Sequence, residues 1–343
     1  MENSDLRKEI LNEYLELFQR YGKMTRDDYV KNSQYLYQYR QCFKSYTHLV
    51  FEAENVDTSK YDFGYIDDLE IKNNPRFYLP RKERKYTLPI ENAPDRYIKI
   101  LILSDLHIPF HNETALDKVL TMLGDTPHDC LIINGDFNEM FAISKFNENS
   151  LKDLEGITLG YEYKIANIVR EKLDNACNWW VKIFGNGNHE DRFNKFMRTG
   201  DNKKLEGALI SPIQALNLKA SNYIILDNSF QDFIEVGNNL EVFHGVYHNK
   251  YFTNKTAEHL LKNAIIGHLH TLQIFTAANG ITCYSLGFMG DLDYNLFNYA
   301  NRLTKQRWKT GFLSVTLDCQ TSKFWVKPVV IEDNEFEFNG KIY

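Results

Sequence analysis

The chain of 343 residues is longer than one typical domain, and its apolar fraction of 43% is ordinary for a globular protein with a large core. Its formal net charge of −6 excludes a basic field over the whole surface, so any contact with nucleic acid must depend on local patches. The 5 cysteines are scattered, odd in number and without a C-x-x-C pair, which indicates reduced thiols and not a disulfide framework.

The N-terminus carries no recognisable targeting or membrane signal. Residues 1–5 are polar and acidic, unlike a signal peptide, and no apolar run reaches the ~18 residues that a membrane-spanning helix needs. We therefore expect no membrane partner and a cytoplasmic location.

Residues 1–55 predict a small helical module. Residues 6–21 place apolar side chains at helical spacing on one face. Thr25, with Asp28 at the spacing of a capping box, predicts the start of a second helix, and a third segment follows at residues 37–53. Residues 56–95 are charged, weakly periodic and interrupted by prolines, which is typical of a linker or a surface-wrapping segment.

Residues 96–332 predict an α/β domain. In its first half, strand-type runs alternate with helical patterns, the strands at 98–103, 130–134 and 181–184 and the helices at 114–123, 161–179 and 191–198. After residue 222 the pattern is mostly strand, at 223–226, 233–236, 240–243, 265–266, 272–277, 281–285, 312–317 and 323–330. Such an order favours two packed sheets flanked by helices, with residues 333–343 as a C-terminal tail.

Side chains that commonly bind metals follow five of these strands. The motifs are D-x-H at 105–107, G-D at 135–136, G-N-H-E at 187–190, H-G at 244–245 and G-H-x-H at 267–270. Because the carboxyl ends of strands in an open α/β sheet lie at one edge, we expect these side chains to converge. The candidate ligands are two carboxylates, one amide oxygen and four imidazoles: Asp105, His107, Asp136, Asn188, His244, His268 and His270.

This set of oxygen and nitrogen ligands predicts a site for two metal ions. It contains no thiolate, which suits cations such as Mn, Fe, Zn or Mg. Seven ligands are too many for one catalytic ion with an open position, but they suffice for two ions if one carboxylate bridges them. Two cations about 3.5–4 Å apart can clamp the attacking and leaving oxygens of a displacement at phosphorus. The pattern therefore predicts hydrolysis of phosphate esters.

The order D-x-H, G-D-x-x-[D/E], G-N-H-[D/E], H-G and G-H-x-H, over roughly residues 97–330, resembles the calcineurin-like metallophosphoesterase superfamily. The resemblance implies that family's two-sheet α-β-β-α sandwich and a hydroxide activated by two divalent ions. Mn²⁺ is the expected metal, with Fe, Zn, Mg and Ni as alternatives. Carried over by position, Asp105, His107 and His270 would hold one ion. Asn188, His244 and His268 would hold the other, and Asp136 would bridge.

The resemblance also assigns two catalytic candidates, and the chemistry of arginine adds a third. His189 would bind the phosphate and protonate the leaving oxygen. Glu139 stands where many relatives have an aspartate that orients this histidine, and it is one methylene longer. Arg192 could clamp a substrate phosphate through two hydrogen bonds, or it could form a surface salt bridge on its helix.

Departures from the pattern narrow the substrate. Phosphoprotein phosphatases carry G-D-x-x-D-R-G, whereas this chain reads G-D-F-N-E-M-F from Gly135. The S-D-x-H-x-P-x-H opening, the N-H-E-x-R continuation and the G-F-x-x-V close resemble phage and prophage members more closely, which implies the cytosol of a bacterial host. We expect phosphodiesters of nucleic acid, with phosphomonoesters of phosphoproteins or small nucleotides as the alternative. A binding protein without turnover is disfavoured because no ligand position is substituted.

Residues 10–55 resemble the small helical DNA-binding repeat attached to phage and homing endonucleases, in the pattern Y-G-K-x-T-R-x-D-Y followed by Y-R-x-x-F-K-S-Y. The resemblance implies DNA contacts through Lys23, Arg26, Arg40 and Lys44. The alternative is a helical cap with solvated charges.

The sequence leaves open the oligomeric state. It also leaves open whether His111 and His248, each four residues after a candidate ligand, reach the cleft.

Overall fold

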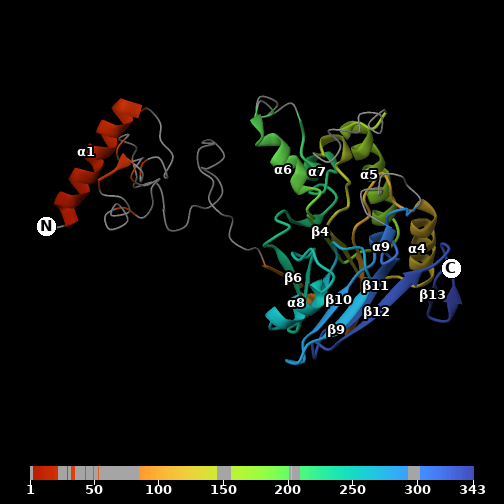
Figure 1. Cartoon of the computed structure of the whole chain (residues 1–343). Coiled ribbons are helices and arrows are strands. Elements are labelled where there is room, and N and C mark those ends of the chain that lie inside the picture. The colour runs from red at the N-terminus through yellow and green to blue at the C-terminus, as the bar shows by residue number, and fades with distance from the viewer. Residues whose placement is uncertain are drawn as a thin grey trace. The chain divides into compact units, whose positions relative to one another are not determined.

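The computed structural model describes residues 3–21, 29, 32–34, 43, 49, 53, 85–144, 156–200, 202, 209–292 and 302–343. The chain divides into two compact units, Met1–Arg81 and Lys82–Tyr343 (Figure 1). The DNA-contact candidates Lys23, Arg26, Arg40 and Lys44 lie outside the described residues, as does the expected N-cap Thr25.

The first unit has an apolar core of its own around one long helix. Helix α1, Asn3–Tyr21, includes the whole of the helix expected from the sequence. Buried side chains of α1 pack with others from the chain that follows, and together they are Ile10, Tyr14, Tyr29, Phe43, Leu49 and Ala53. The carboxylate of Glu13 accepts hydrogen bonds from Ser33 Oγ at 2.5 Å and from the backbone N–H of Gln34 at 2.8 Å. This helix is therefore held to its own module by burial and by hydrogen bonds.

The second unit contains two six-stranded sheets. Sheet A has the order β1 (Lys85–Thr87), β6 (Phe233–Val236), β7 (Leu240–Phe243), β8 (Asn263–Ile266), β10 (Thr282–Ser285) and β9 (Gln273–Thr276). Sheet B has the order β12 (Phe324–Ile331), β11 (Thr310–Asp318), β2 (Tyr97–Leu103), β3 (Cys130–Asn134), β4 (Val181–Gly185) and β5 (Tyr223–Leu226).

Strands β2, β3, β4 and β5 are parallel, whereas β11 is antiparallel to both β2 and β12. Parallel neighbours need crossover connections. Helices α4 (Glu113–Asp125) and α5 (Leu159–Asp174) lie in the first two of these crossovers. Their starts follow from the sequence, because the side chains of Asn112 and Thr158 cap the first turns of α4 and α5 respectively.

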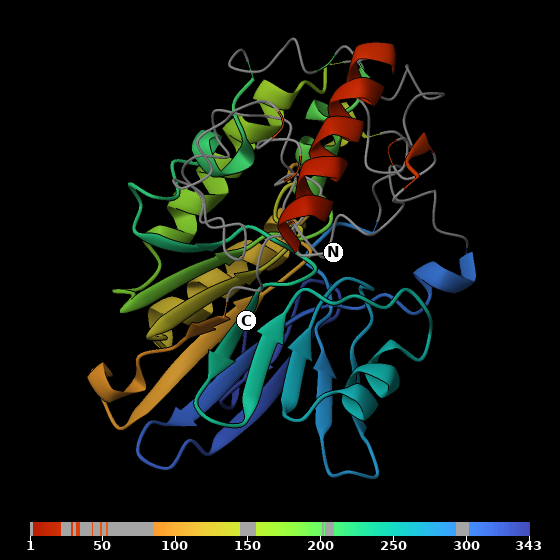
Figure 2. The ribbon, with the colours of Figure 1, turned by 90° about the vertical axis from the view of Figure 1, so that its left-hand side faces the viewer.

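The unit has four layers, and the side-chain alternation of β2 shows how they form. Leu101 and Leu103 point to the face covered by α4 and α5, whereas Ile98, Ile100 and Ile102 point to the face packed on sheet A. On the other face of sheet A lies α8 (Phe252–His259), the teal helix at the lower right of Figure 2. The order is helices, sheet B, sheet A, helix. The expected two-sheet α-β-β-α sandwich is confirmed.

The described residues of the unit also form shorter helices: η4 (Ile90–Asn92), η5 (Phe141–Ile143), α6 (Asp191–Met197), α7 (Pro212–Ala215) and α9 (Arg302–Lys305). The structure differs from expectation at several places. Strand β1 lies within the range expected to be a linker, where it pairs with β6 at the edge of sheet A. The pattern expected to be helical to residue 179 ends at Asp174, and the indole of Trp179 donates a hydrogen bond to Leu173 O at 2.7 Å. Helix α8 was not expected.

The C-terminal residues form part of the domain core. Strands β13 (Glu337–Phe338) and β14 (Lys341–Ile342) pair as a hairpin. Phe336 and Phe338 are buried in the apolar cluster between sheet B and its helices, and both rings lie against Phe312. The range 333–343, expected to be a tail, is therefore fixed by apolar burial.

Candidate metal centre

The candidate ligands follow the carboxyl ends of strands from both sheets. Asp105 and His107 come after β2, Asp136 after β3, and Asn188 after β4 in sheet B, while the other three follow β7 and β8 in sheet A. Backbone hydrogen bonds join the loops, from Asp105 N to Gly135 O at 3.0 Å and from His107 N to Asp136 O at 2.9 Å. The expected convergence therefore occurs at one place where the two sheets meet.

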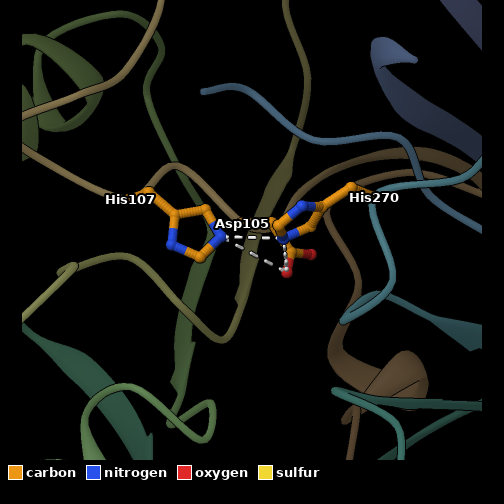
Figure 3. A group of neighbouring side chains, drawn as sticks. All are labelled: Asp105, His107 and His270. Atoms are coloured by element: carbon orange, nitrogen blue, oxygen red, sulfur yellow. Dashed lines mark hydrogen bonds and ion pairs between the residues drawn. The ribbon is translucent and has the colours of Figure 1, made fainter. Parts of the chain in front are cut away.

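The first group consists of Asp105, His107 and His270, all buried (Figure 3). The Nε2 atoms of His107 and His270 are 2.9 Å apart. Asp105 Oδ1 lies 3.3 Å from Nε2 of His270 and 3.8 Å from Nε2 of His107. Three ligand atoms thus face one another from strand ends in different sheets.

The second group consists of Asp136, His244 and His268. Nε2 of His244 lies 3.2 Å from Asp136 Oδ2 and 3.1 Å from the side-chain oxygen of Asn188. A third group comprises His107, Asp136 and His189. Asp136 therefore belongs to two of the three groups, and the structure brings all seven candidate ligands together.

Unusual backbone geometry at the strand ends permits this arrangement. Asp105, His107, Asp136, His268 and His270 all have positive φ angles, between 51° and 80°. Such conformations cost non-glycine residues about 1–3 kcal/mol each and persist only where the surroundings enforce them. A Cβ at Gly187 would overlap the side chain of Asp136, and one at Gly267 would overlap Ser104 and Asp105. These motif glycines allow the loops to approach closely.

The hydrogen bonds of the histidine rings suit metal binding. Nδ1 of His107 lies 2.6 Å from Glu139 Oε2, and Nδ1 of His244 lies 2.9 Å from Asn134 O. Each ring can donate its Nδ1–H to that oxygen, so that in the neutral imidazole the lone pair lies on Nε2, on the side of the carboxylates. Nδ1 of His268 is buried and has no hydrogen-bond partner among the described residues. The ligand set and its ring orientations therefore fit divalent cations.

Burial and neighbouring charges shift the pKa values of the candidate ligands in different directions. Burial raises the pKa of Asp105, but His270 and His244 lower it more, to about 2. Burial lowers the pKa of His268 to about 3, so this ring is neutral at pH 7. For His244, burial opposes charging, yet the neighbouring Asp136 outweighs it and raises the pKa to about 10. Because metal ligands must be deprotonated, a cation bound at His244 would replace this proton.

Glu139, His189 and Arg192 form a connected cluster beside the ligands. Nδ1 of His189 lies 3.0 Å from Glu139 Oε2, and Nη1 of Arg192 donates to Glu139 Oε1 at 3.0 Å. Nη2 of Arg192 lies 2.9 Å from Nε2 of His189. Burial opposes ionisation of Glu139, but His189 and His107 hold the pKa of this carboxyl well below its usual range. Arg192 thus contacts the candidate acid and the glutamate expected to orient it.

Two buried glutamates support the site without having been assigned a role from the sequence. Glu190 accepts backbone hydrogen bonds from Asp136 N at 3.0 Å, Gly187 N at 2.8 Å and Asn138 N at 2.8 Å. Burial, with the charge of Asp136, raises its pKa to about 7. Glu162 similarly accepts from two backbone N–H groups just after Glu139. The G-N-H-E motif contains Glu190, but nothing in the sequence indicates that its carboxylate joins two loops.

A cleft of about 450 Å³ opens beside the centre. It is lined by candidate ligands and His189 and by further polar, basic and aromatic side chains, among them His248, Lys250, Arg307 and Trp308. His248 therefore reaches the cleft. His111 is buried, pairs with Gly290 in an isolated β-bridge and is not among the residues that line this cleft in the described part of the chain.

No family model matches the chain, and no curated protein matches it. Among solved structures, it is similar to Vps29 from Entamoeba histolytica complexed with zinc, with 12% identity over 70% of this chain and 96% of that chain and a TM-score of 0.36. It is similar to Vps29 from Cryptosporidium parvum, with 14% identity over 73% and 96% and a TM-score of 0.36. It is also similar to the nuclease MPE from Pseudomonas putida, with 14% identity over 66% and 87% and a TM-score of 0.28. At these TM-scores the structural similarities carry no argument about the function of this chain.

Within the described residues, no helix has the length and apolarity to cross a membrane.

Proposed function

We propose that this protein is a metal-dependent phosphoesterase that binds two divalent cations and hydrolyses phosphodiesters of nucleic acid. The observation that carries the proposal is the position of Asp136, which shares one ligand group with His244 and His268 and another with His107 and His189. A carboxylate so placed can bridge two ions, and a bridged pair is suited to displacement at phosphorus.

The residues that would hold the ions follow from the two groups. Asp105, His107 and His270 would bind one ion and Asn188, His244 and His268 the other, with Asp136 common to both. When bound, the ions would polarise the phosphoryl oxygens and lower the pKa of water. Mn²⁺ is the proposed metal, with Fe, Zn, Mg and Ni as alternatives, because carboxylate, amide and imidazole ligands without thiolate suit cations of this group.

His189 is the proposed general acid. It lines the cleft, and its Nδ1 lies 3.0 Å from both the backbone carbonyl oxygen and the carboxylate Oε2 of Glu139, which orient the ring and leave Nε2 toward the substrate side. Nε2 lies 3.7 Å from Asp136 Oδ2, so a leaving oxygen beside the bridging carboxylate would be within reach. Arg192 holds Nε2 in this structure and would give up that contact to bind the phosphate.

Two features support nucleic acid as the substrate class. Lys250 and Arg307 line the same cleft as the candidate ligands, although they come from distant segments, and they would suit the phosphates on either side of the scissile one. The resemblance of residues 10–55 to a DNA-binding repeat supplies the second. DNA contact through Lys23, Arg26, Arg40 and Lys44 belongs to this proposal.

A substrate panel tests the proposal. The full chain, loaded with Mn²⁺, is assayed on bis-nitrophenyl phosphate, nitrophenyl phosphate, single-stranded and double-stranded DNA, RNA and a phosphopeptide. We expect diester substrates to be hydrolysed faster than monoesters and a chelator to abolish turnover. A rate on the phosphopeptide far above those on nucleic acid would establish the phosphomonoesterase alternative, and activity that survives removal of all metal would refute the mechanism.

A further inference from the structure

A histidine outside the candidate ligand set contacts one of its members directly. Nδ1 of His248, in the loop after β7, lies 2.7 Å from Nε2 of His268. The two rings meet edge to face, with centroids 4.5 Å apart and planes inclined by 75°. His248 is exposed and lines the cleft, so this contact lies at the open side of the second ligand group.

The other ring nitrogen of His268 faces inward. Nδ1 is buried and lacks a hydrogen-bond partner among the described residues, although the ring belongs to the group with Asp136 and His244. The backbone N–H of His268 donates to both oxygens of Asp105, at 3.2 and 3.0 Å, which fixes the residue against the first group. A buried nitrogen without a protein partner needs an explanation, and a bound ion would provide one.

Tautomer chemistry connects these two observations. A neutral imidazole carries one N–H, and the nitrogen that binds a metal must be the one without it. If Nε2–H of His268 donates to Nδ1 of His248, the proton is held on the outer nitrogen, and the buried Nδ1 keeps the lone pair that can bind a cation in the group with Asp136 and His244. His244 is arranged in the same manner with the nitrogens exchanged, since its Nδ1 faces Asn134 O and its Nε2 faces Asp136.

We propose that His248 is a positioning residue for the second metal: it accepts the Nε2–H of His268 and so presents Nδ1 of His268 to the cation shared with Asp136 and His244. The inference rests on the proposed metal centre. Neither the motifs nor the spacing of the candidate ligands predicts this contact between His248 and His268. Partners of this kind typically change metal affinity by about 10–100-fold when they are removed.

Three variants of the full chain test the proposal. His248→Leu removes the acceptor, and His248→Asn keeps an oxygen acceptor near the position of Nδ1. His259→Leu is the matched control, because its Nδ1 faces Lys255 O at 2.6 Å on α8 and its ring lies near Tyr247. Each protein is stripped with a chelator and titrated with Mn²⁺ by calorimetry, with electron paramagnetic resonance to distinguish single ions from coupled pairs.

We expect the wild-type protein and His259→Leu to bind two ions. In His248→Leu one ion should bind as in wild type and the other about 10–100-fold more weakly, with much of the loss restored in His248→Asn. Two ions of unchanged affinity in His248→Leu would overturn the proposal. Equal weakening by Leu and Asn would also overturn it. So would a rise in KM with no change in metal affinity, which would make His248 a substrate contact.

Thermal unfolding of the metal-free proteins separates positioning from folding. The melting temperatures of the three variants should equal that of wild type, and loss of both ions together with a lower melting temperature in His248→Leu would contradict the inference. The proposed function is judged by different results. Wild-type protein that binds two ions but hydrolyses no phosphate ester would refute the function and leave the His248 result intact. Wild-type protein that binds no Mn²⁺ would refute both.

Discussion

The carboxylate of Glu139 lies 2.6 Å from Nδ1 of His107, a candidate ligand that precedes it by 32 positions. The same oxygen, Oε2, lies 3.0 Å from Nδ1 of His189. One side chain thus contacts both a candidate ligand and the candidate acid, and the backbone carbonyl of Glu139 also lies 3.0 Å from Nδ1 of His189. From the sequence we expected the second contact alone. The added methylene relative to an aspartate increases the reach of the carboxylate.

Shortening or neutralising the Glu139 side chain should affect both metal binding and catalysis. Glu139→Gln keeps the volume but removes the charge, and we expect about 10–100-fold weaker binding of the ion held by His107, together with lower kcat on bis-nitrophenyl phosphate. Glu139→Asp should retain one of the two contacts and show an intermediate loss. Metal titration and steady-state kinetics measure both effects. Glu171→Gln, an exposed position on α5, is the control and should behave as wild type. Unchanged metal affinity in Glu139→Gln would argue against the contact with His107.

Replacing Asp136 should disrupt the metal pair. The side chain of Asp136→Asn retains one oxygen but loses the negative charge that would bridge two cations, so turnover should be abolished while the fold remains. Circular dichroism checks the fold, and metal analysis at saturating Mn²⁺ counts the ions. Asp117→Asn, on the exposed side of α4, is the matched control. Full activity in Asp136→Asn, or one ion per wild-type chain, would refute the two-metal interpretation.

Removing the proposed acid should matter most for poor leaving groups. General acid catalysis contributes about 10²–10⁴-fold, and His189→Ala should lose that much in kcat on an alkyl phosphodiester while retaining its metals. On bis-nitrophenyl phosphate the loss should be smaller, because nitrophenolate leaves with little need of a proton. His259→Ala serves as the control. Equal losses on both substrates would indicate that His189 binds the phosphate without protonating the leaving oxygen.

The N-terminal unit should govern DNA affinity and leave the chemistry unchanged. Changing Lys23, Arg26, Arg40 and Lys44 together to Ala should weaken DNA binding and reduce its salt dependence, because each phosphate contact releases counterions. Hydrolysis of bis-nitrophenyl phosphate should persist, since all candidate ligands lie after residue 100. Binding curves measured at several salt concentrations give the slope. An unchanged slope would identify this unit as a structural cap.

An ion-pair cluster at the edge of sheet A should make stability depend on pH. Lys262 and Lys85, together with Thr87, bind the carboxylate of Glu235, and hydrogen bonds from the two lysines lower its pKa to about 2. Because this folded-state pKa lies below the ordinary value of 4.5, the stabilisation is complete above pH 4.5 and is lost as the pH falls toward 2.

Glu235→Gln tests this cluster. At pH 7 we expect a loss of about 1 kcal/mol or less in the free energy of unfolding, since the lysines are partly exposed and screened by solvent. The difference in the free energy of unfolding between Glu235→Gln and wild type should decrease as the pH falls from 4.5 toward 2. Urea unfolding over this pH range measures it, with Glu258→Gln, on the exposed side of α8, as the control. A difference that does not change with pH would exclude a charge effect.

Local patterns in the sequence determined the elements and the chemical nature of the site. Runs of apolar residues report burial of a strand or of a helix face, so β3, β5, β6 and β7 were predicted at the residues where they occur. The same runs located the strand ends, and the residue types that follow them indicated oxygen and nitrogen ligands. Helix α8 was missed because only part of its surface is buried and its sequence is weakly apolar.

Only the tertiary structure decided which of these residues touch. His107 and His270 are 163 positions apart, and His248 and His268 come from loops after different strands of sheet A. Such contacts depend on how two sheets pack and on positive-φ turns at the strand ends, and neither leaves a periodic signal in the chain. The sequence by itself therefore determined the candidate ligand set. The fold alone decided that Glu139, Glu190 and His248 contact members of that set or their loops, since these contacts arise from distances across loops that the chain order does not encode.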